Sequence, residues 1–135
     1  MIEGTIRTFD KEVQDMIHRR LDEIVKGTAA AYGLSAELVL DIGYPATVNS
    51  ERQTAFAADV AREVAGDAAV NAAQGMEMGA EDFSYMLEAR PGSYLFLGAG
   101  EGAGLHNPAF DFNDEIAPIG ASFFAKLVET AQPLK

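Results

Sequence analysis

The sequence predicts an α/β protein, because two kinds of hydrophobic periodicity alternate along its 135 residues. Some segments carry an apolar side chain at every second position, which is typical of strands, and others at every third or fourth position, which is typical of helices. Hydrophobic residues make up 48% and charged residues 23% of the chain, a balance that favours a globular over a disordered protein.

The N-terminal part of the chain predicts a strand, a helix and a second strand. Residues 4–9 alternate in polarity and are rich in β-branched side chains, as strands are. Asp10 predicts the N-cap of a helix, which we expect to end between Lys26 and Tyr32. Residues 35–44 return to the alternation of a strand.

The remainder alternates helices with short apolar segments that could form buried strands. The expected ranges, helix and strand in turn, are 51–65, 68–73, 81–89, 93–98 and 118–131. Gly66 ends the first of these helices. Functional loops of open α/β sheets leave the carboxyl ends of strands, so the loop after Leu97 is expected to carry functional residues.

The charge balance excludes two classes of partner. A formal net charge of −11 argues against sequence-independent nucleic-acid binding and against an anionic membrane surface. No apolar run approaches the ~20 residues of a membrane-spanning helix, and no signal-peptide pattern opens the chain. The absence of cysteine removes disulfides and thiolate metal sites, so we expect a cytoplasmic location.

His106 is one of only two histidines and follows a glycine-rich run, residues 98–104. A solitary loop histidine is by default a surface residue, but the glycines before it and Asn107-Pro108 after it favour a presented side chain. Imidazole suits Zn²⁺, Ni²⁺, Mn²⁺ or Co²⁺, yet a metal site needs three or four converging ligands. The nearby candidates are only carboxylates, namely Glu77, Glu81, Asp82, Asp111, Asp114 and Glu115. From these residues alone no complete metal centre can be assembled.

Two further features have both a structural and a functional interpretation. Glu81 and Asp82 fall in the first turn of a short expected helix, where the helix dipole favours carboxylates as much as catalysis does. Arg7 alternates with Ile6 on an expected strand. An exposed strand arginine is common, but its planar guanidinium can also bind a carboxylate through two hydrogen bonds.

Four long motifs together resemble a known family. They are "GTIRTFD", "GYPATVN", "MGAEDFSYMLEARPGSYLFLGAG" and "LHNPAFDFNDEIAPIGASFFAKLVE". In order and spacing they resemble the C-terminal part of the hippurate hydrolase-like N-acyl-amino-acid amidohydrolases, a metallopeptidase and aminoacylase family. The resemblance covers nearly the whole chain.

The resemblance implies a fold of two parts. Residues 1–45 resemble the second half of a ferredoxin-like lid and dimerisation domain, a strand-helix-strand unit. Residues 46–135 resemble the C-terminal α/β section of a zinc-peptidase-like catalytic domain. Because the family's lid dimerises, the resemblance also implies a homo-oligomer.

The same resemblance assigns roles to four residues. It makes His106 the last metal ligand and Arg7 the residue that holds the substrate carboxylate. Gly79 and Glu81 lie near the metal and substrate cleft and are expected to contribute to substrate binding. The reaction implied is metal-dependent hydrolysis of the amide bond of N-acyl amino acids, with Zn, Mn, Ni or Co in the complete protein.

The family's other metal ligands and its general-base Glu fall outside this sequence, which therefore resembles a fragment. We expect this chain alone to bind no metal and to have no amidase activity. Two alternatives stay open. The chain could be a non-catalytic interaction or oligomerisation module that keeps the family's scaffold, or a small metal-binding protein that uses His106 with the neighbouring acids.

Overall fold

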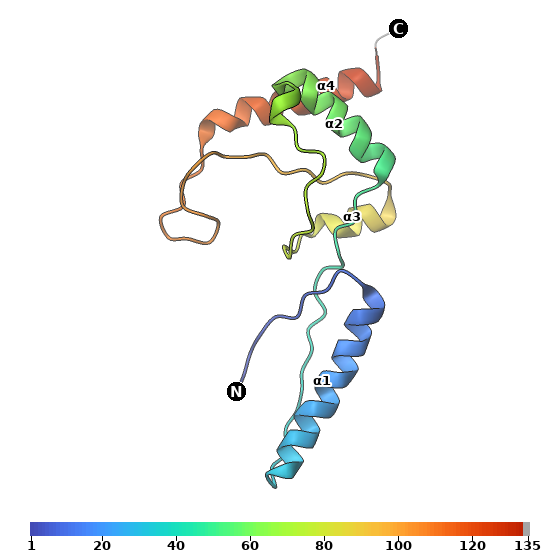
Figure 1. The fold of residues 1–135 in the computed structure, drawn as a ribbon, viewed down its shortest axis with the longest axis vertical. Helices are drawn as coiled ribbons and strands as arrows, with labels where there is room; N and C mark the ends of the chain where they lie inside the picture. The colour runs from blue at the N-terminus through green and yellow to red at the C-terminus, as the bar shows by residue number, and fades with distance from the viewer. Residues whose placement is uncertain (134–135) are drawn as a thin grey trace. The chain divides into compact units, whose positions relative to one another are not determined.

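The computed structural model describes residues 1–133, and its regular secondary structure is helical (Figure 1). The elements in chain order are α1 Lys11–Ala31, α2 Glu51–Ala65, η1 Asp67–Ala69, α3 Phe83–Ala89, η2 Asp114–Ile116 and α4 Ala117–Ala131, where η marks a single 3₁₀ turn. None of these helices is both long and apolar enough to cross a membrane.

The predicted α/β fold class is wrong, because no residue between 1 and 133 lies in a β-strand. The strand-helix-strand lid and the α/β catalytic section are therefore not the folds of this structure. Of the segments expected to be strands, 4–9, 35–44 and 93–98 have no regular secondary structure. The expected strand 68–73 is also absent, because residues 68 and 69 belong to η1 and residues 70–73 are irregular. Alternating side chains make a segment able to pair, but a strand exists only where its backbone groups meet those of a partner strand.

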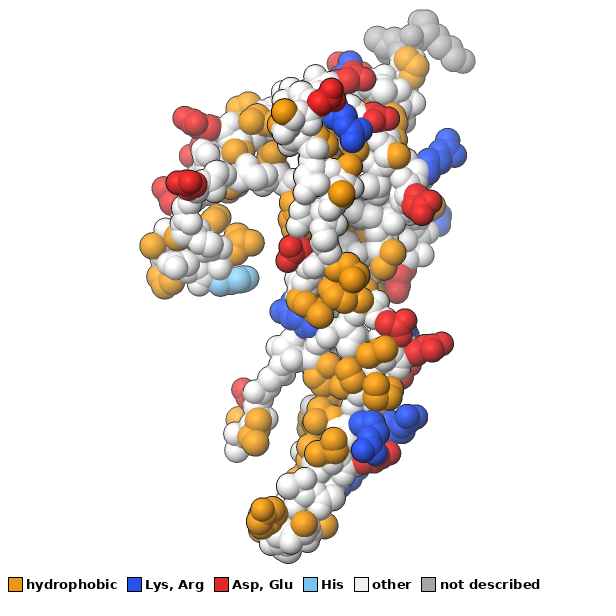
Figure 2. Space-filling model, viewed as in Figure 1, with side chains coloured by type: hydrophobic (Ala, Val, Ile, Leu, Met, Phe, Trp, Pro, Cys, Tyr) orange, Lys and Arg blue, Asp and Glu red, His pale blue; other side chains and the backbone are white. Residues whose placement is uncertain are grey.

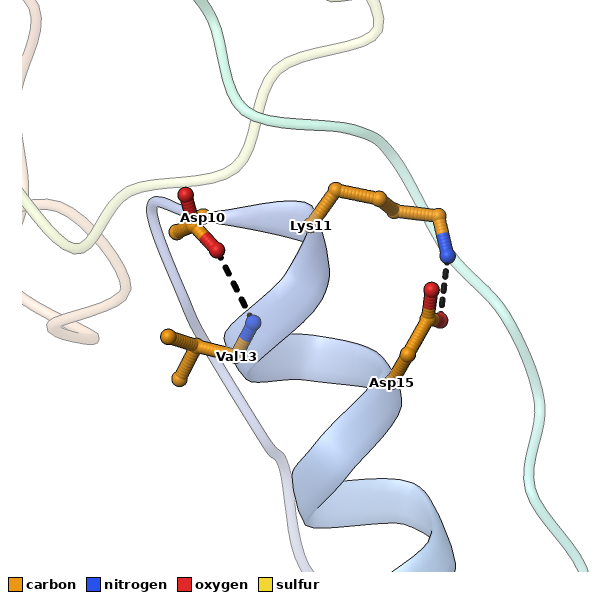
Figure 3. Close-up of polar contacts among 4 residues, drawn as sticks. All are labelled: Asp10, Lys11, Val13 and Asp15. Carbon is orange, nitrogen blue, oxygen red and sulfur yellow. Dashed lines mark hydrogen bonds and ion pairs between the residues drawn. The ribbon is translucent and has the colours of Figure 1, made fainter.

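Helix α1 confirms the predicted cap and end. The Asp10 carboxylate accepts a hydrogen bond from the Val13 N–H at 2.9 Å, and the Lys11 ammonium pairs with Asp15 one turn further on (Figure 3). At the other end, the Gly33 N–H donates to the Ala30 carbonyl at 3.0 Å. Gly33 has a φ of 69°, the left-handed conformation with which many helices end.

Helices α2 and α4 pack against each other, and α2 supplies the buried hydrophobic residues of the described chain. Ala57, Ala58 and Val60, all on α2, are 1–5% exposed. The Lys126 ammonium on α4 pairs with the Glu63 carboxylate on α2 at 2.9 Å. As predicted, α2 ends at Gly66, whose N–H donates to the Arg62 carbonyl.

The chain divides into two compact units. Unit 1 comprises Met1–Thr47 and Met76–Met86, and unit 2 comprises Val48–Gly75 and the residues from Leu87 on. The expected domains, residues 1–45 and 46–135, stay a prediction.

Much apolar surface is exposed, and Figure 2 shows hydrophobic side chains along the visible face. The accessible surface is 11162 Å², whereas a compact protein of 14.4 kDa exposes about 6,800 Å². Two separate compact bodies that share this mass would expose about 8,200 Å² together. The hydrophobic effect therefore favours contacts that remove some of the exposed hydrophobic side chains from water.

Candidate functional site

Arg7 is joined to a segment that lies 71 positions further along the chain. Its guanidinium donates a hydrogen bond to the backbone carbonyl of Met78, and both residues belong to unit 1. Gly79 follows Met78 directly, and Glu81 lies two residues beyond Gly79. The structure therefore brings Arg7 to the segment that carries the other two predicted substrate-binding residues.

The end of this segment is fixed by Ser84, a buried polar residue with no exposed surface. The Ser84 hydroxyl donates to the Glu81 carbonyl at 2.6 Å, and the Ser84 N–H reaches the same oxygen at 3.2 Å. Two bonds to one carbonyl fix the backbone turn from which the half-buried Glu81 side chain extends.

Tyr85 joins the same segment to another part of unit 1. Its hydroxyl donates to the Gly43 carbonyl at 3.4 Å, and its ring meets the ring of Tyr44 edge-on, with 5.8 Å between centroids. Residues 76–86 are thus held near their start by Arg7 and near their end by Tyr85.

The chemistry available at this segment is that of a guanidinium that can bind a carboxylate. Arg7 is exposed and carries five N–H donors, of which the bond to Met78 uses one. The remaining donors can accept a planar carboxylate as a bidentate partner. A Cβ added at Gly79 would meet no atom within 4 Å, as at most glycines of the chain, so no side chain fills the space there.

His106 is exposed in a tight turn of unit 2. The Asn107 N–H donates to the Gly104 carbonyl at 3.2 Å, and His106, with a φ of 65°, occupies the third position of that turn. A positive φ here, with none at the preceding Leu105, is the pattern of a type II turn, in which glycine is the usual third residue. The Asn107 side chain forms a second turn by accepting from the Ala109 N–H at 2.9 Å.

The two ends of the His106 loop meet at Asn113. Its side-chain amide donates to the Ala99 carbonyl at 3.1 Å, and its side-chain oxygen accepts from the Glu115 N–H at 3.1 Å. Gly100, the next residue after Ala99, has a φ of 83°, so the chain leaves this junction through a conformation that favours glycine.

The predicted site residues thus form two groups, each within its own unit. Arg7, Gly79 and Glu81 lie in unit 1, and His106 lies in unit 2. Within residues 1–133 no three histidine or acidic side chains converge into a possible metal site. The described residues alone therefore do not supply the three or four donors that hold a divalent metal, and His106 is a single candidate donor.

Unit 2 also contains an apolar pocket of about 410 Å³ between the end of α2 and the start of α4. It is lined by Val64, Ala65, Ala69, Pro118, Ile119 and Ser122. None of these side chains is titratable at neutral pH, so this pocket offers no acid-base or metal chemistry.

Sequence reasoning missed three groups that shape these sites: the Met78 carbonyl, Ser84 and Asn113. A backbone acceptor such as the Met78 carbonyl leaves no signal in a sequence. Asn113 does leave one, because asparagine followed by two acids is an N-cap pattern. Ser84 stands three residues after Glu81, a spacing at which a hydroxyl can reach back to a carbonyl.

The family model described as peptidase family M20/M25/M40 matches residues 3–130. An N-acetyl-L-cysteine deacetylase of Bacillus subtilis is 37% identical over 99% of this chain and 31% of its own length. A hippurate hydrolase of Campylobacter jejuni is 29% identical over 93% of this chain and 33% of its own length. An N-acetyldiaminopimelate deacetylase of Streptococcus thermophilus is 31% identical over 93% of this chain and 33% of its own length. The chain spans about a third of the length of these relatives, and no solved structure matches it.

Proposed function

The chain belongs to peptidase family M20/M25/M40, and from that membership we propose that it is part of a metal-dependent amidohydrolase acting on N-acyl amino acids. Three relatives are named for the removal of acyl groups from amino acids or their derivatives, namely the two deacetylases and the hippurate hydrolase. A common chemical feature of such substrates is an amide bond next to a free carboxylate. The proposal is that this chain binds that carboxylate.

The observation that carries the proposal is the hydrogen bond from Arg7 to the Met78 carbonyl. It fixes a guanidinium beside the backbone of Gly79, where no side chain fills the space. Arg7 is the carboxylate-binding residue in this proposal, and Gly79 and Glu81 line the same place. Glu81 also repels a second negative charge, which favours substrates whose only anion faces Arg7.

His106 is the residue of unit 2 that we propose for metal binding. A bound divalent metal would supply a water of lowered pKa and polarise the acyl carbonyl. Since the described residues contribute one imidazole and no converging set of acids, we propose that this chain alone has no amidase activity. Hydrolysis would need further donors from the part of the relatives that this chain does not match.

The test uses a full-length family protein that contains this chain as its matching third. Arg7→Ala should raise KM for N-acetyl amino acids about tenfold or more, since a charge-assisted bidentate contact is lost. The effect should nearly vanish for the matching N-acetyl amino amide, which has no carboxylate. His106→Ala should lower kcat at least a hundredfold and reduce the bound metal. Arg90→Ala is the matched control, because Arg90 donates only to the adjacent Ala89 carbonyl among the observed bonds.

Two outcomes would contradict the proposal. One is an equal effect of Arg7→Ala on the acid and amide substrates. The other is chelator-sensitive turnover by the 135-residue chain above a metal-only blank.

A non-catalytic interaction module is the second candidate, and the exposed hydrophobic surface favours it. Such a module needs neither His106 nor Arg7 for chemistry. Normal activity of the His106→Ala and Arg7→Ala variants in the longer protein, together with stable association of this chain with a partner, would favour the module.

A further inference from the structure

We propose that Asn113 is a positioning residue that closes the base of the loop carrying His106 and fixes that loop to the start of α4. The significance of this for catalysis rests on the proposed role of His106. The loop closure itself follows from the geometry of unit 2 alone.

All the hydrogen-bonding groups that link Asn113 to its surroundings act across the loop base or into the following helix. The side-chain Nδ2 donates to the Ala99 carbonyl, 14 positions earlier in the chain. The side-chain Oδ1 accepts from the Glu115 N–H, and the backbone carbonyl accepts from the Ile116 N–H at 3.2 Å. One half-buried residue thus joins the beginning of the loop, its end and η2.

The loop needs such a contact because its own turns act only locally. The turns closed by Asn107 set the backbone of His106 and Ala109, but they do not tie the loop to a helix. The segment before His106 contains Gly98, Gly100, Gly102 and Gly104. Glycine has the greatest conformational freedom to lose, so an untied loop of this composition samples many positions.

The connection from Asn113 leads to the buried part of unit 2. Helix η2 runs directly into α4, and α4 packs against α2, which carries the buried Val60. A hydrogen bond at the loop base therefore ties the loop that carries His106 to the packed helices α2 and α4.

Asn113→Asp separates loop closure from helix capping. Aspartate is as good an N-cap as asparagine, so the bond to the Glu115 N–H remains. An ionised carboxylate has no proton to donate, so the bond to the Ala99 carbonyl is lost and two oxygens face each other. Asn71→Asp is the matched control, because Asn71 likewise donates through Nδ2 and accepts through Oδ1 in another loop of unit 2.

The experiment measures backbone ¹⁵N order parameters of residues 100–112 in the 135-residue chain, with far-UV circular dichroism as a check on the helices. In Asn113→Asp we expect order parameters in this loop to fall below about 0.6, with unchanged helicity. Asn71→Asp should leave the loop unchanged. Loop order parameters in Asn113→Asp equal to those of the unmodified chain would overturn the proposal.

Kinetics of the longer protein separate this inference from the proposed function. A displacement of about 1 Å in a reacting group can lower a rate a hundredfold, so Asn113→Asp should lower kcat about tenfold or more with little change in KM. If the loop loosens while both Asn113→Asp and His106→Ala retain full activity, the loop closure stands and the role of His106 in catalysis fails.

Discussion

Different kinds of interaction stabilise the inside of each of the two units. Helix α1 in unit 1 is the longest helix, yet none of its residues is buried, and it is stabilised by its Asp10 cap and by ion pairs one turn apart. Unit 2 buries Ala57, Ala58 and Val60 where α2 packs against α4. Local interactions therefore specify the helix of unit 1, whereas packing between distant segments specifies unit 2.

Polar side chains also join distant segments in unit 2. The Asn49 side chain forms two hydrogen bonds with the backbone of Tyr94, donating to its carbonyl at 2.8 Å and accepting from its N–H at 2.7 Å. Asn49 thus satisfies both backbone groups of Tyr94 within the segment 93–98 that was expected to be a strand, where a neighbouring strand would otherwise do so. Asn113 makes one such bond just beyond this segment, donating to the Ala99 carbonyl at 3.1 Å.

The largest expected difference between the units is in the loss of a buried side chain. Val60→Ala in α2 should lower the free energy of unfolding of unit 2 by about 1–3 kcal/mol, because Val60 is 1% exposed and truncation leaves a cavity. Ile24→Ala in α1 is the control, since Ile24 is 54% exposed. Urea unfolding followed by circular dichroism measures both. An equal loss in the two variants would show that burial does not distinguish unit 2 from α1.

A smaller effect is expected at the local cap of α1. Asp10→Ala should cost about 1 kcal/mol of helix stability, because the Val13 N–H loses its acceptor (Figure 3). Asp15→Ala removes only the exposed ion pair with Lys11 and should cost less than about 0.5 kcal/mol. Amide hydrogen exchange in the first turn of α1 compares them. Equal protection in the two variants would mean that the cap does not specify the helix start.

The smallest effect concerns the ion pair between α2 and α4. The hydrogen bond to Glu63 and its charge raise the pKa of Lys126 above its ordinary value of 10.5. The stabilisation from this pair is therefore complete below pH 10.5 and is lost as the pH rises through the raised pKa. The stability difference between the unmodified chain and Lys126→Gln should stay constant from pH 7 to 9 and shrink above about pH 10.5. A difference that already shrinks between pH 7 and 9 would show that another group titrates.

How far the sequence could predict the fold depended on the range of the interaction. The start of α1 at Asp10 and the end of α2 at Gly66 were predicted, because caps and stop signals act within a few residues. Residues 4–9 and 35–44 were wrongly predicted to be strands. Their alternation is a true property of the sequence, but a strand also needs a partner, which the sequence pattern does not supply.

The candidate site divides in the same way. Residue chemistry and family resemblance indicated Arg7, Glu81 and His106. Neither indicated that Arg7 would reach the Met78 carbonyl or that Asn113 would meet Ala99, since both contacts join residues far apart in the chain. The expected association with a second copy stays a prediction.

Patterns in the amino-acid sequence were enough to establish the family, the positions of the main helices and the residue types available for chemistry. These depend on patterns within a few residues or on similarity spread along the chain. Three further features became known from the folded chain: extended segments are unpaired, α2 packs against α4, and side chains hold residues 76–86 and the His106 loop. The physical reason is that hydrogen bonds and burial between distant segments depend on which groups the folded chain brings within reach.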